Sequence, residues 1–176
     1  IFNCVKENVR LTIDGLEEFE YIEQAAKQLD TEAKVRLRMR PALKGFTRHS
    51  DFVPTGPMPT DIAALAYKGG LPRDAVIEIG RKILKSNHVR LVGFHEHHGR
   101  HHPSLKYWEE QMKSFAREIG IVCSALGDFV PKEIDIGGGF ACPRDPFASE
   151  VRFSEPYEYM LLYILSKALG IFPRVR

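Results

Sequence analysis

The chain has 176 residues, of which 44% are hydrophobic and 27% are charged; this is typical of one soluble globular domain and excludes a disordered or fibrous protein. Its net charge of +2 is too small to indicate a nucleic-acid or membrane partner, which leaves small-molecule ligands open. The three cysteines, Cys4, Cys123 and Cys142, are widely separated and form no CxxC pair, which argues against a disulfide framework or a zinc knuckle and favours the reducing cytoplasm.

The first half of the chain predicts strands and a helix in alternation. Residues 9–13 alternate apolar and polar side chains as a strand does, and residues 14–29 carry apolar side chains at helical spacing. Residues 34–39 repeat the strand pattern, which Pro41 ends. A stretch rich in proline and glycine follows at 55–72. It is longer than an ordinary connector, which is typical of a functional loop.

The second half predicts further strand and helix pairs. Helices are expected at 72–84, at 103–120 with Gly120 as the stop signal, and at 155–170, and strands at 88–94 and 132–136. Strands that alternate with helices in this way predict a parallel sheet covered by helices.

Two architectures fit this alternation: a doubly wound open sheet, or part of a (β/α)8 barrel. A full barrel takes ~250 residues, so the predicted units amount to about half of one. Half a barrel would leave two unpaired edges. The chain also begins without Met and stops at "GIFPRVR", where apolar residues alternate with basic ones as at the start of a strand. We therefore expect the natural chain to continue on both sides.

Three consecutive glycines, Gly137, Gly138 and Gly139, follow the strand expected at 132–136. Ligands of barrels and open α/β sheets bind at this end of the strands, and glycine lets backbone N–H groups close on an anion such as a phosphate. A tight turn without a ligand is the other interpretation. The spacing matches neither a dinucleotide motif nor a P-loop.

The stretch "LVGFHEHHGRHH", residues 91–102, contains five histidines. Strand alternation places His95 and His97 on one face and His98 on the other, with His101 and His102 in the loop beyond. Imidazole suits several transition metals, but no fixed ligand spacing such as HExxH is present. A metal site and a solvated histidine-rich loop are both open for this stretch.

The stretch "VRLRMRP" places Arg36, Arg38 and Arg40 on one face of a strand, opposite Val35, Leu37 and Met39. In a parallel sheet buried on both faces, arginines need anionic partners. The alternative is an edge strand with a wet face.

Taken in this order along the chain, these strands, helices and motifs resemble the barrel of the fold type III pyridoxal-phosphate (PLP) decarboxylases. This family includes diaminopimelate, ornithine and biosynthetic arginine decarboxylases. The family's strand with its following helix and its LRxxP, KFG, GxHxHxGS and DIGGGF motifs are matched by "LTIDGLEEFEYIEQAAK", "VRLRMRP", "YKGGLP", "LVGFHEHHGR" and "EIDIGGGF". The match covers nearly the whole chain, and the last two motifs are the specific ones. It implies a partial (β/α)8 TIM barrel of the alanine racemase-like type with about four βα units. It also predicts that residues 1–176 are one segment of a PLP-binding barrel domain, without its N-terminal units and C-terminal β-domain.

The resemblance implies roles for individual residues. His97 matches the histidine that stacks on the cofactor ring, and Gly137 to Gly139 match the phosphate-binding glycines. Arg38 matches the strand arginine near the phenolic oxygen of the cofactor, and Asp135 matches the acid before the glycines. Arg100 replaces the phosphate-binding serine of HxGS and could bind phosphate through its charge and fork geometry.

Other positions depart from the family. The Asn of LRxNP is Arg40 here, and the Phe of KFG is Gly69. The family's Schiff-base lysine lies on an early strand with a VKAN-like sequence, which "CVKEN" at residues 4–8 mimics. We reject Lys6 for this role, because Lys6 is too close in sequence to Arg38 and the next residues already match a later unit. An EPGR strand is expected just beyond Arg176.

The implied function of the parent protein is the removal of the α-carboxylate of an amino acid through a Schiff base with PLP. The expected partners are a small amino-acid substrate and a second copy in a cytoplasmic homodimer, with no nucleic acid and no membrane. The chain alone is expected to be inactive. A non-catalytic PLP-binding homologue, a histidine-rich metal module, and a racemase, aldolase or dehydratase of the same barrel type are the alternatives.

Overall fold

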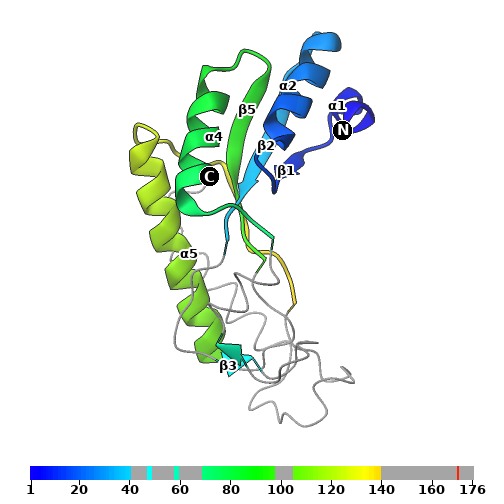
Figure 1. Ribbon diagram of the computed structural model, residues 1–176. Helices are drawn as coiled ribbons and strands as arrows, with labels where there is room; N and C mark the ends of the chain where they lie inside the picture. Colours follow the sequence, from blue (N-terminus) through cyan, green and yellow to red (C-terminus); the bar gives the residue numbers. More distant parts are fainter. Residues whose placement is uncertain (41–46, 49–57, 60–68, 98–104, 140–169, 171–176) are drawn as a thin grey trace.

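The computed structural model describes residues 1–40, 47–48, 58–59, 69–97, 105–139 and 170, and the fold is that of these residues (Figure 1). The helices are α1 (Phe2–Lys6), α2 (Glu18–Gln28), α4 (Arg73–Lys85) and α5 (Leu105–Ala125). The strands are β1 (Leu11–Ile13), β2 (Ala33–Arg38), β3 (Thr47–Arg48), β4 (Met58–Pro59), β5 (Val89–His95) and β6 (Glu133–Asp135).

The main sheet has four strands in the order β1-β2-β5-β6, and every neighbouring pair is parallel. The strands therefore follow one another across the sheet in the order in which they occur in the sequence. A doubly wound sheet reverses this order at a switch point, whereas a barrel does not. The α/β alternation and the barrel-type arrangement predicted from the sequence are confirmed. The short strands β3 and β4 pair antiparallel in a separate sheet.

The two faces of the main sheet differ in polarity. Along β2 every second side chain is buried and those between are partly exposed. The apolar face and three helices form one core, in which each buried aliphatic side chain contributes about 1.5–3 kcal/mol. The helix residues in this core include Phe19, Ile22 and Ala26 of α2, Val76, Ile79 and Ile83 of α4, and Phe115, Ile119 and Val122 of α5. The helices α2, α4 and α5 thus cover the same side of the sheet, and the other side carries polar groups.

The helices follow from simple sequence signals. Pro72 precedes α4 with φ −64°, an angle that its ring sets. In α2, acidic Glu18 and Glu20 lie in the first turn, and Lys27 in the last turn contacts Glu23 at 2.9 Å.

The structure corrects one expectation, agrees with a second and decides between two alternatives that the sequence left open. The helix expected to stop at Gly120 continues to Ala125. Residues 4–6 belong to helix α1, and Lys6 is exposed in its last turn, which agrees with its rejection as a strand lysine. The arginine-bearing strand is not an edge strand, because β2 lies between β1 and β5. Of the helix expected at 155–170, only Gly170 is among the described residues.

Within the described ranges, the structure contains no helix both long enough and apolar enough to cross a membrane.

Candidate functional site

The polar face of the sheet is built on the arginines of β2 and its end. Arg36, Arg38 and Arg40 are each partly exposed, while Val35, Leu37 and Met39 between them are buried. Among the described residues, the buried Nε atoms of all three arginines have no hydrogen-bond partner. A buried donor without an acceptor costs about 1–3 kcal/mol. On the described part of this face, the hydrogen-bond donors therefore outnumber the acceptors that satisfy them.

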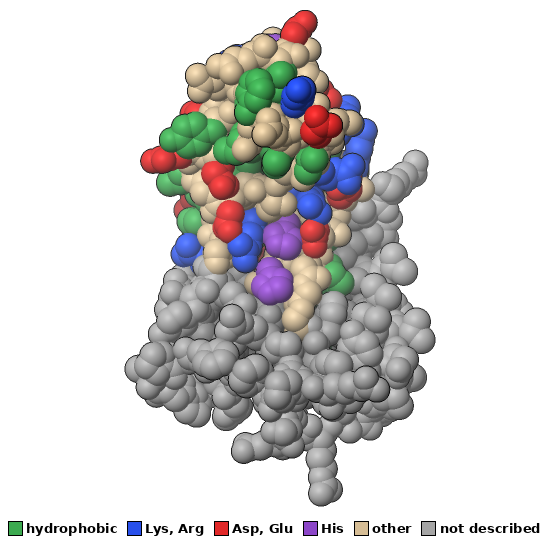
Figure 2. Space-filling view, turned by 90° about the vertical axis from the view of Figure 1, so that its right-hand side faces the viewer, with side chains coloured by type: hydrophobic (Ala, Val, Ile, Leu, Met, Phe, Trp, Pro, Cys, Tyr) green, Lys and Arg blue, Asp and Glu red, His purple; other side chains and the backbone are tan. Residues whose placement is uncertain are grey.

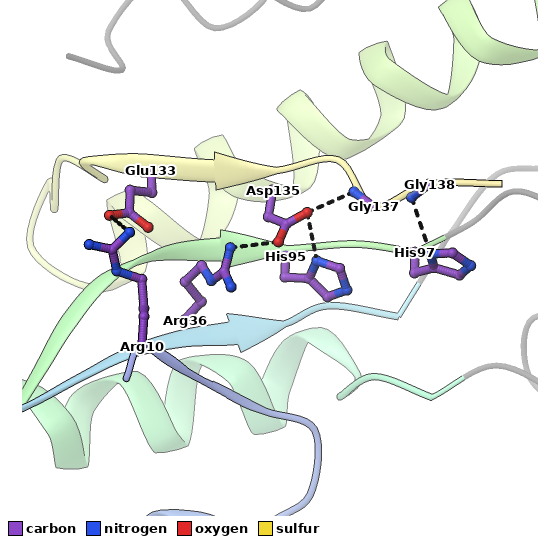
Figure 3. A network of polar contacts seen from close by, with 8 residues as sticks. All are labelled: Arg10, Arg36, His95, His97, Glu133, Asp135, Gly137 and Gly138. Carbon is purple, nitrogen blue, oxygen red and sulfur yellow. Dashed lines mark hydrogen bonds and ion pairs between the residues drawn. The ribbon is translucent and has the colours of Figure 1, made fainter. Parts of the chain in front are cut away.

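Asp135, at the end of β6, connects three neighbouring groups (Figure 3). Its carboxylate accepts from Arg36 Nη1 at 2.5 Å and from the Gly137 N–H at 2.9 Å. His95 Nδ1 lies 3.2 Å from Oδ1 but is not aligned for a hydrogen bond. One carboxylate thus links β2, β5 and the glycine turn.

Burial and neighbouring polar groups determine the charges of Asp135 and His95. Burial opposes ionisation of Asp135, but the hydrogen bond from the Gly137 amide and the charge of Arg36 help to hold the pKa of this carboxyl below its ordinary value. Burial lowers the pKa of His95, and the nearby Asp135 opposes this only in part. At neutral pH the carboxylate is therefore ionised and the imidazole is neutral.

Asp14 follows β1 directly and was missed by the sequence analysis as a site residue. Its carboxylate accepts from Arg38 Nη1 and from the Gly70 N–H. A Cβ added at Gly69 would lie 2.6 Å from both Arg38 Nη1 and Asp14 Oδ2. The ion pair therefore occupies the space that a side chain at residue 69 needs, which gives a physical reason for glycine at this departure from the family pattern.

His97 and the glycine turn are in direct contact. The Gly138 N–H donates to His97 Nδ1 at 3.2 Å, so this ring nitrogen carries no proton. Gly137 has φ +68°, and a Cβ on it would lie 2.5 Å from the Glu96 carbonyl oxygen and 2.9 Å from His97 Nδ1. A Cβ on Gly138 would meet nothing within 4 Å. The glycines thus make room for the imidazole on one side and leave space open on the other.

Glu96, between the two histidines, is buried on the helix side of the sheet and was also missed. The Gln111 Nε2 of α5 donates to its Oε1 at 2.8 Å. Burial raises the pKa of Glu96 to about 8, which the Gln111 hydrogen bond only partly offsets. At pH 7 the carboxyl is therefore mostly protonated. The pair attaches the segment that carries His95 and His97 to α5.

The structure brings most of the predicted site residues to one end of the sheet. Arg38, His97, Asp135 and residues 137–139 lie at or just beyond the carboxyl ends of β2, β5 and β6. Figure 2 shows histidine, acidic and basic side chains gathered together on one face. Arg100 lies outside the described residues, as do His98, His101 and His102. In the part of the chain that the structure describes, no three metal-ligating side chains come together.

Comparisons with known proteins support the fold. No protein-family model matches the sequence, and a search of curated proteins finds no match. A diaminopimelate decarboxylase from M. jannaschii in complex with L-lysine is 17% identical with a TM-score of 0.72, over 99% of this chain and 37% of that one. The enzyme from Helicobacter pylori with L-lysine is 21% identical with a TM-score of 0.69, over 97% and 40%.

A third solved structure is lysine decarboxylase from Selenomonas ruminantium, whose complex with PLP and cadaverine is 19% identical with a TM-score of 0.64, over 98% of this chain and 36% of that one. The chain therefore has the fold of a part of the TIM-barrel-like domain of these decarboxylases, and it spans well under half of their length. At the level of fold, the resemblance seen in the sequence is confirmed.

Proposed function

We propose that this chain is the PLP-binding barrel segment of an amino-acid decarboxylase similar to diaminopimelate and ornithine decarboxylases. The observation that carries the proposal is the contact between His97 and the glycine turn at the carboxyl end of the strands. The fold supports it, because the solved structures of similar fold include enzymes that hold PLP or L-lysine. This chain matches only 36–40% of the length of those proteins, which supports its role as one segment of a larger domain.

The residues on the polar face fit this cofactor. A flat aromatic phosphate needs an imidazole or aromatic surface, donors for the anion and room beside the backbone. The face offers the His97 ring, three arginine Nε donors that have no acceptor in the part of the chain that the structure describes, and open space where a Gly138 Cβ would lie. In the structure the Gly137 and Gly138 amides donate to Asp135 and His97. These two amides could bind a phosphate only by giving up Asp135 and His97 as acceptors. The arginine Nε atoms have no acceptor among the described residues to give up.

In the proposed site, PLP supplies an electron sink for the loss of carbon dioxide from an amino acid. His97 would hold the ring, residues 137–139 the phosphate and Arg38 the side of the phenolic oxygen. Asp135 would remain paired with Arg36 beside the glycine turn, and Asp14 would orient Arg38. Arg100 would add a positive charge near the phosphate. No lysine within the 176 residues matches the expected Schiff-base lysine, so the proposal assigns to this chain the binding of the cofactor and not the covalent step.

The proposal is tested by titrating the full-length natural protein with PLP and recording absorbance and PLP fluorescence. We expect saturable binding that His97→Ala and Arg38→Gln weaken. His88→Ala is the matched control, because His88 precedes β5 at the opposite end of the strand and should leave the affinity unchanged. Protein that binds no PLP would refute the proposed function. PLP binding without a lysine adduct and without release of carbon dioxide from any amino acid would instead identify a non-catalytic homologue.

A further inference from the structure

The arginines of the polar face are not equally neutralised. Among the described residues, four arginines of this face each contact one carboxylate: Arg36–Asp135, Arg38–Asp14, Arg10–Glu133 and, at the opposite end of the sheet, Arg90–Glu32. Arg40 is left without a carboxylate partner among the described residues.

The structure holds Arg40 at the rim where barrels bind their ligands. Its N–H donates to the Leu71 carbonyl oxygen at 2.9 Å, and Leu71 forms a parallel bridge with Met39. The backbone of Arg40 is thus fixed one alternation beyond Arg38, on the same face. Its Nε is buried and has no acceptor among the described residues. A partly buried guanidinium whose Nε has no acceptor, and whose charge has no carboxylate partner, within the described ranges is suited to bind a carboxylate or phosphate.

Arg40 and the glycine turn are not neighbours on the sheet. Arg40 follows β2 and the turn follows β6, and β5 lies between these two strands. His97, at the end of β5, therefore lies between the glycines and Arg40 in the order of strands. An anionic group held by the glycines and one held by Arg40 would belong to different parts of the bound molecules.

We infer that Arg40 binds a second anionic group, a carboxylate at the far end of the substrate, so that the site selects an amino acid with an acidic far end over one with a basic end. This inference rests on the proposed function, since it assumes that the cofactor phosphate is bound at the glycine turn. It makes Arg40 a residue that determines substrate specificity. Three amino acids of similar chain length distinguish the cases: L-α-aminoadipate has an acidic end, L-norleucine a neutral end and L-lysine a basic end.

The experiment measures binding and not turnover. The full-length natural protein is loaded with pyridoxine 5′-phosphate, which has no aldehyde and cannot react with an amine, and is titrated with each amino acid by calorimetry. We expect L-α-aminoadipate to bind more tightly than L-norleucine, and L-lysine to bind most weakly. Arg40→Gln should remove the preference for the acidic end, a change on the order of tenfold to a hundredfold for a charge-assisted hydrogen bond. Arg40→Lys should retain part of it, because it keeps the charge without the fork.

Arg90→Gln is the matched control, because it removes the same charge from the other end of the sheet, where Arg90 is 45% exposed and contacts Glu32. It should leave all three affinities unchanged. Equal weakening of all three amino acids by Arg40→Gln, or a loss of cofactor affinity with no change in preference, would overturn the inference. The latter result would assign Arg40 to the phosphate. Failure of the wild-type protein to bind PLP or its analogue would refute the proposed function instead, and is recognised before any amino acid is added.

Discussion

Gly137 and Gly138 are neighbours in one turn, yet a methyl group would meet different surroundings at each. At Gly137 the backbone has a positive φ, and a Cβ would press against the Glu96 carbonyl and the His97 ring. At Gly138 a Cβ would point into empty space. One glycine is therefore required by the fold, and the other leaves space that a ligand can use.

Substitution by alanine should separate these two roles. Gly137→Ala is expected to lower the free energy of unfolding by about 1–3 kcal/mol, because a left-handed backbone and a close contact are both unfavourable for alanine. Gly138→Ala should change the unfolding free energy by less than about 0.5 kcal/mol but weaken PLP binding, because its methyl group enters the open space. Urea unfolding and PLP titration measure the two effects. Equal effects of both changes on stability would contradict this division.

Glu96 should make the stability depend on pH. Its pKa is about 8 in the folded protein, against an ordinary value of 4.5, so the folded state retains a proton that the unfolded chain has lost. Below pH 4.5 both states are protonated and the contribution is fully present. It is lost progressively as the pH rises from 4.5 through 8. We expect the urea-unfolding free energy to fall over this window, and Glu96→Gln to flatten the fall.

Glu78→Gln is the control for this measurement, because Glu78 lies on the surface of α4 with its side chain 64% exposed. It should leave the pH profile of the wild-type protein unchanged. A profile that keeps its full slope in Glu96→Gln would show that another group is responsible.

Part of the site could be predicted from the sequence, because two simple rules apply to it. Period-two alternation places His95 and His97 on one face, and residues just after parallel strands meet at one edge of the sheet. These rules do not identify partners. Asp14 lies 24 residues from Arg38, and Glu96 lies 15 residues from Gln111. Such pairs depend on how strands and helices pack, although a carboxylate directly after a strand, as in Asp14, is a signal that could have been used.

Individual elements depart from the sequence rules where tertiary packing outweighs local preference. Helix α5 passes through Gly120, since Val122 and Leu126 beyond it belong to the hydrophobic core. The helix ends instead before Gly127, which has φ +76° and whose N–H donates to the Ser124 carbonyl. A glycine is a strong stop signal only where the backbone takes the left-handed conformation. That condition is not visible in the residue type alone.

Alanine substitutions at two further glycines, Gly93 and Gly120, test how tightly the backbone is packed at each position. A Cβ on Gly93 of β5 would overlap the carbonyl oxygen of Glu133 in the backbone of β6, so Gly93→Ala should force the two strands apart. We expect a loss of about 3 kcal/mol in unfolding free energy, as for an overpacked core. Gly120→Ala is the control, because a Cβ there meets nothing within 4 Å. It should stabilise the protein by roughly 0.5–1 kcal/mol through helix propensity. Thermal and urea unfolding measure both.

At the scale of the whole molecule, ion pairs on the polar face connect strands that are far apart in sequence. Arg10, just before β1, contacts Glu133 of β6 at 2.6 Å, and Arg36 of β2 contacts Asp135 of β6 at 2.5 Å. The side chains of Arg36 and Asp135 are 22% and 32% exposed, whereas Arg10 is 47% exposed. Water and salt screen the exposed pair more strongly.

Double-mutant cycles should rank these two pairs by burial. We expect a coupling energy of about 1–2 kcal/mol between Arg36 and Asp135, and below about 1 kcal/mol between Arg10 and Glu133. Arg→Gln, Asp→Asn and Glu→Gln changes provide the cycles, with urea unfolding at low and high salt as the measurement. Only the Arg10–Glu133 coupling should disappear at high salt. The reverse ranking would mean that exposure does not control the strength of these contacts.

The alternation along β2 also constrains how this protein can vary in length. Odd-numbered residues of the strand are in the core, and the even-numbered ones are basic: Lys34, Arg36 and Arg38. Deleting a single residue between Ala33 and Arg38 would move every later side chain to the opposite face of the sheet. The guanidinium groups would then point into the hydrophobic core and Leu37 would point out of it. Insertions and deletions in related genes should therefore avoid this strand, even where several of its amino acids have been exchanged.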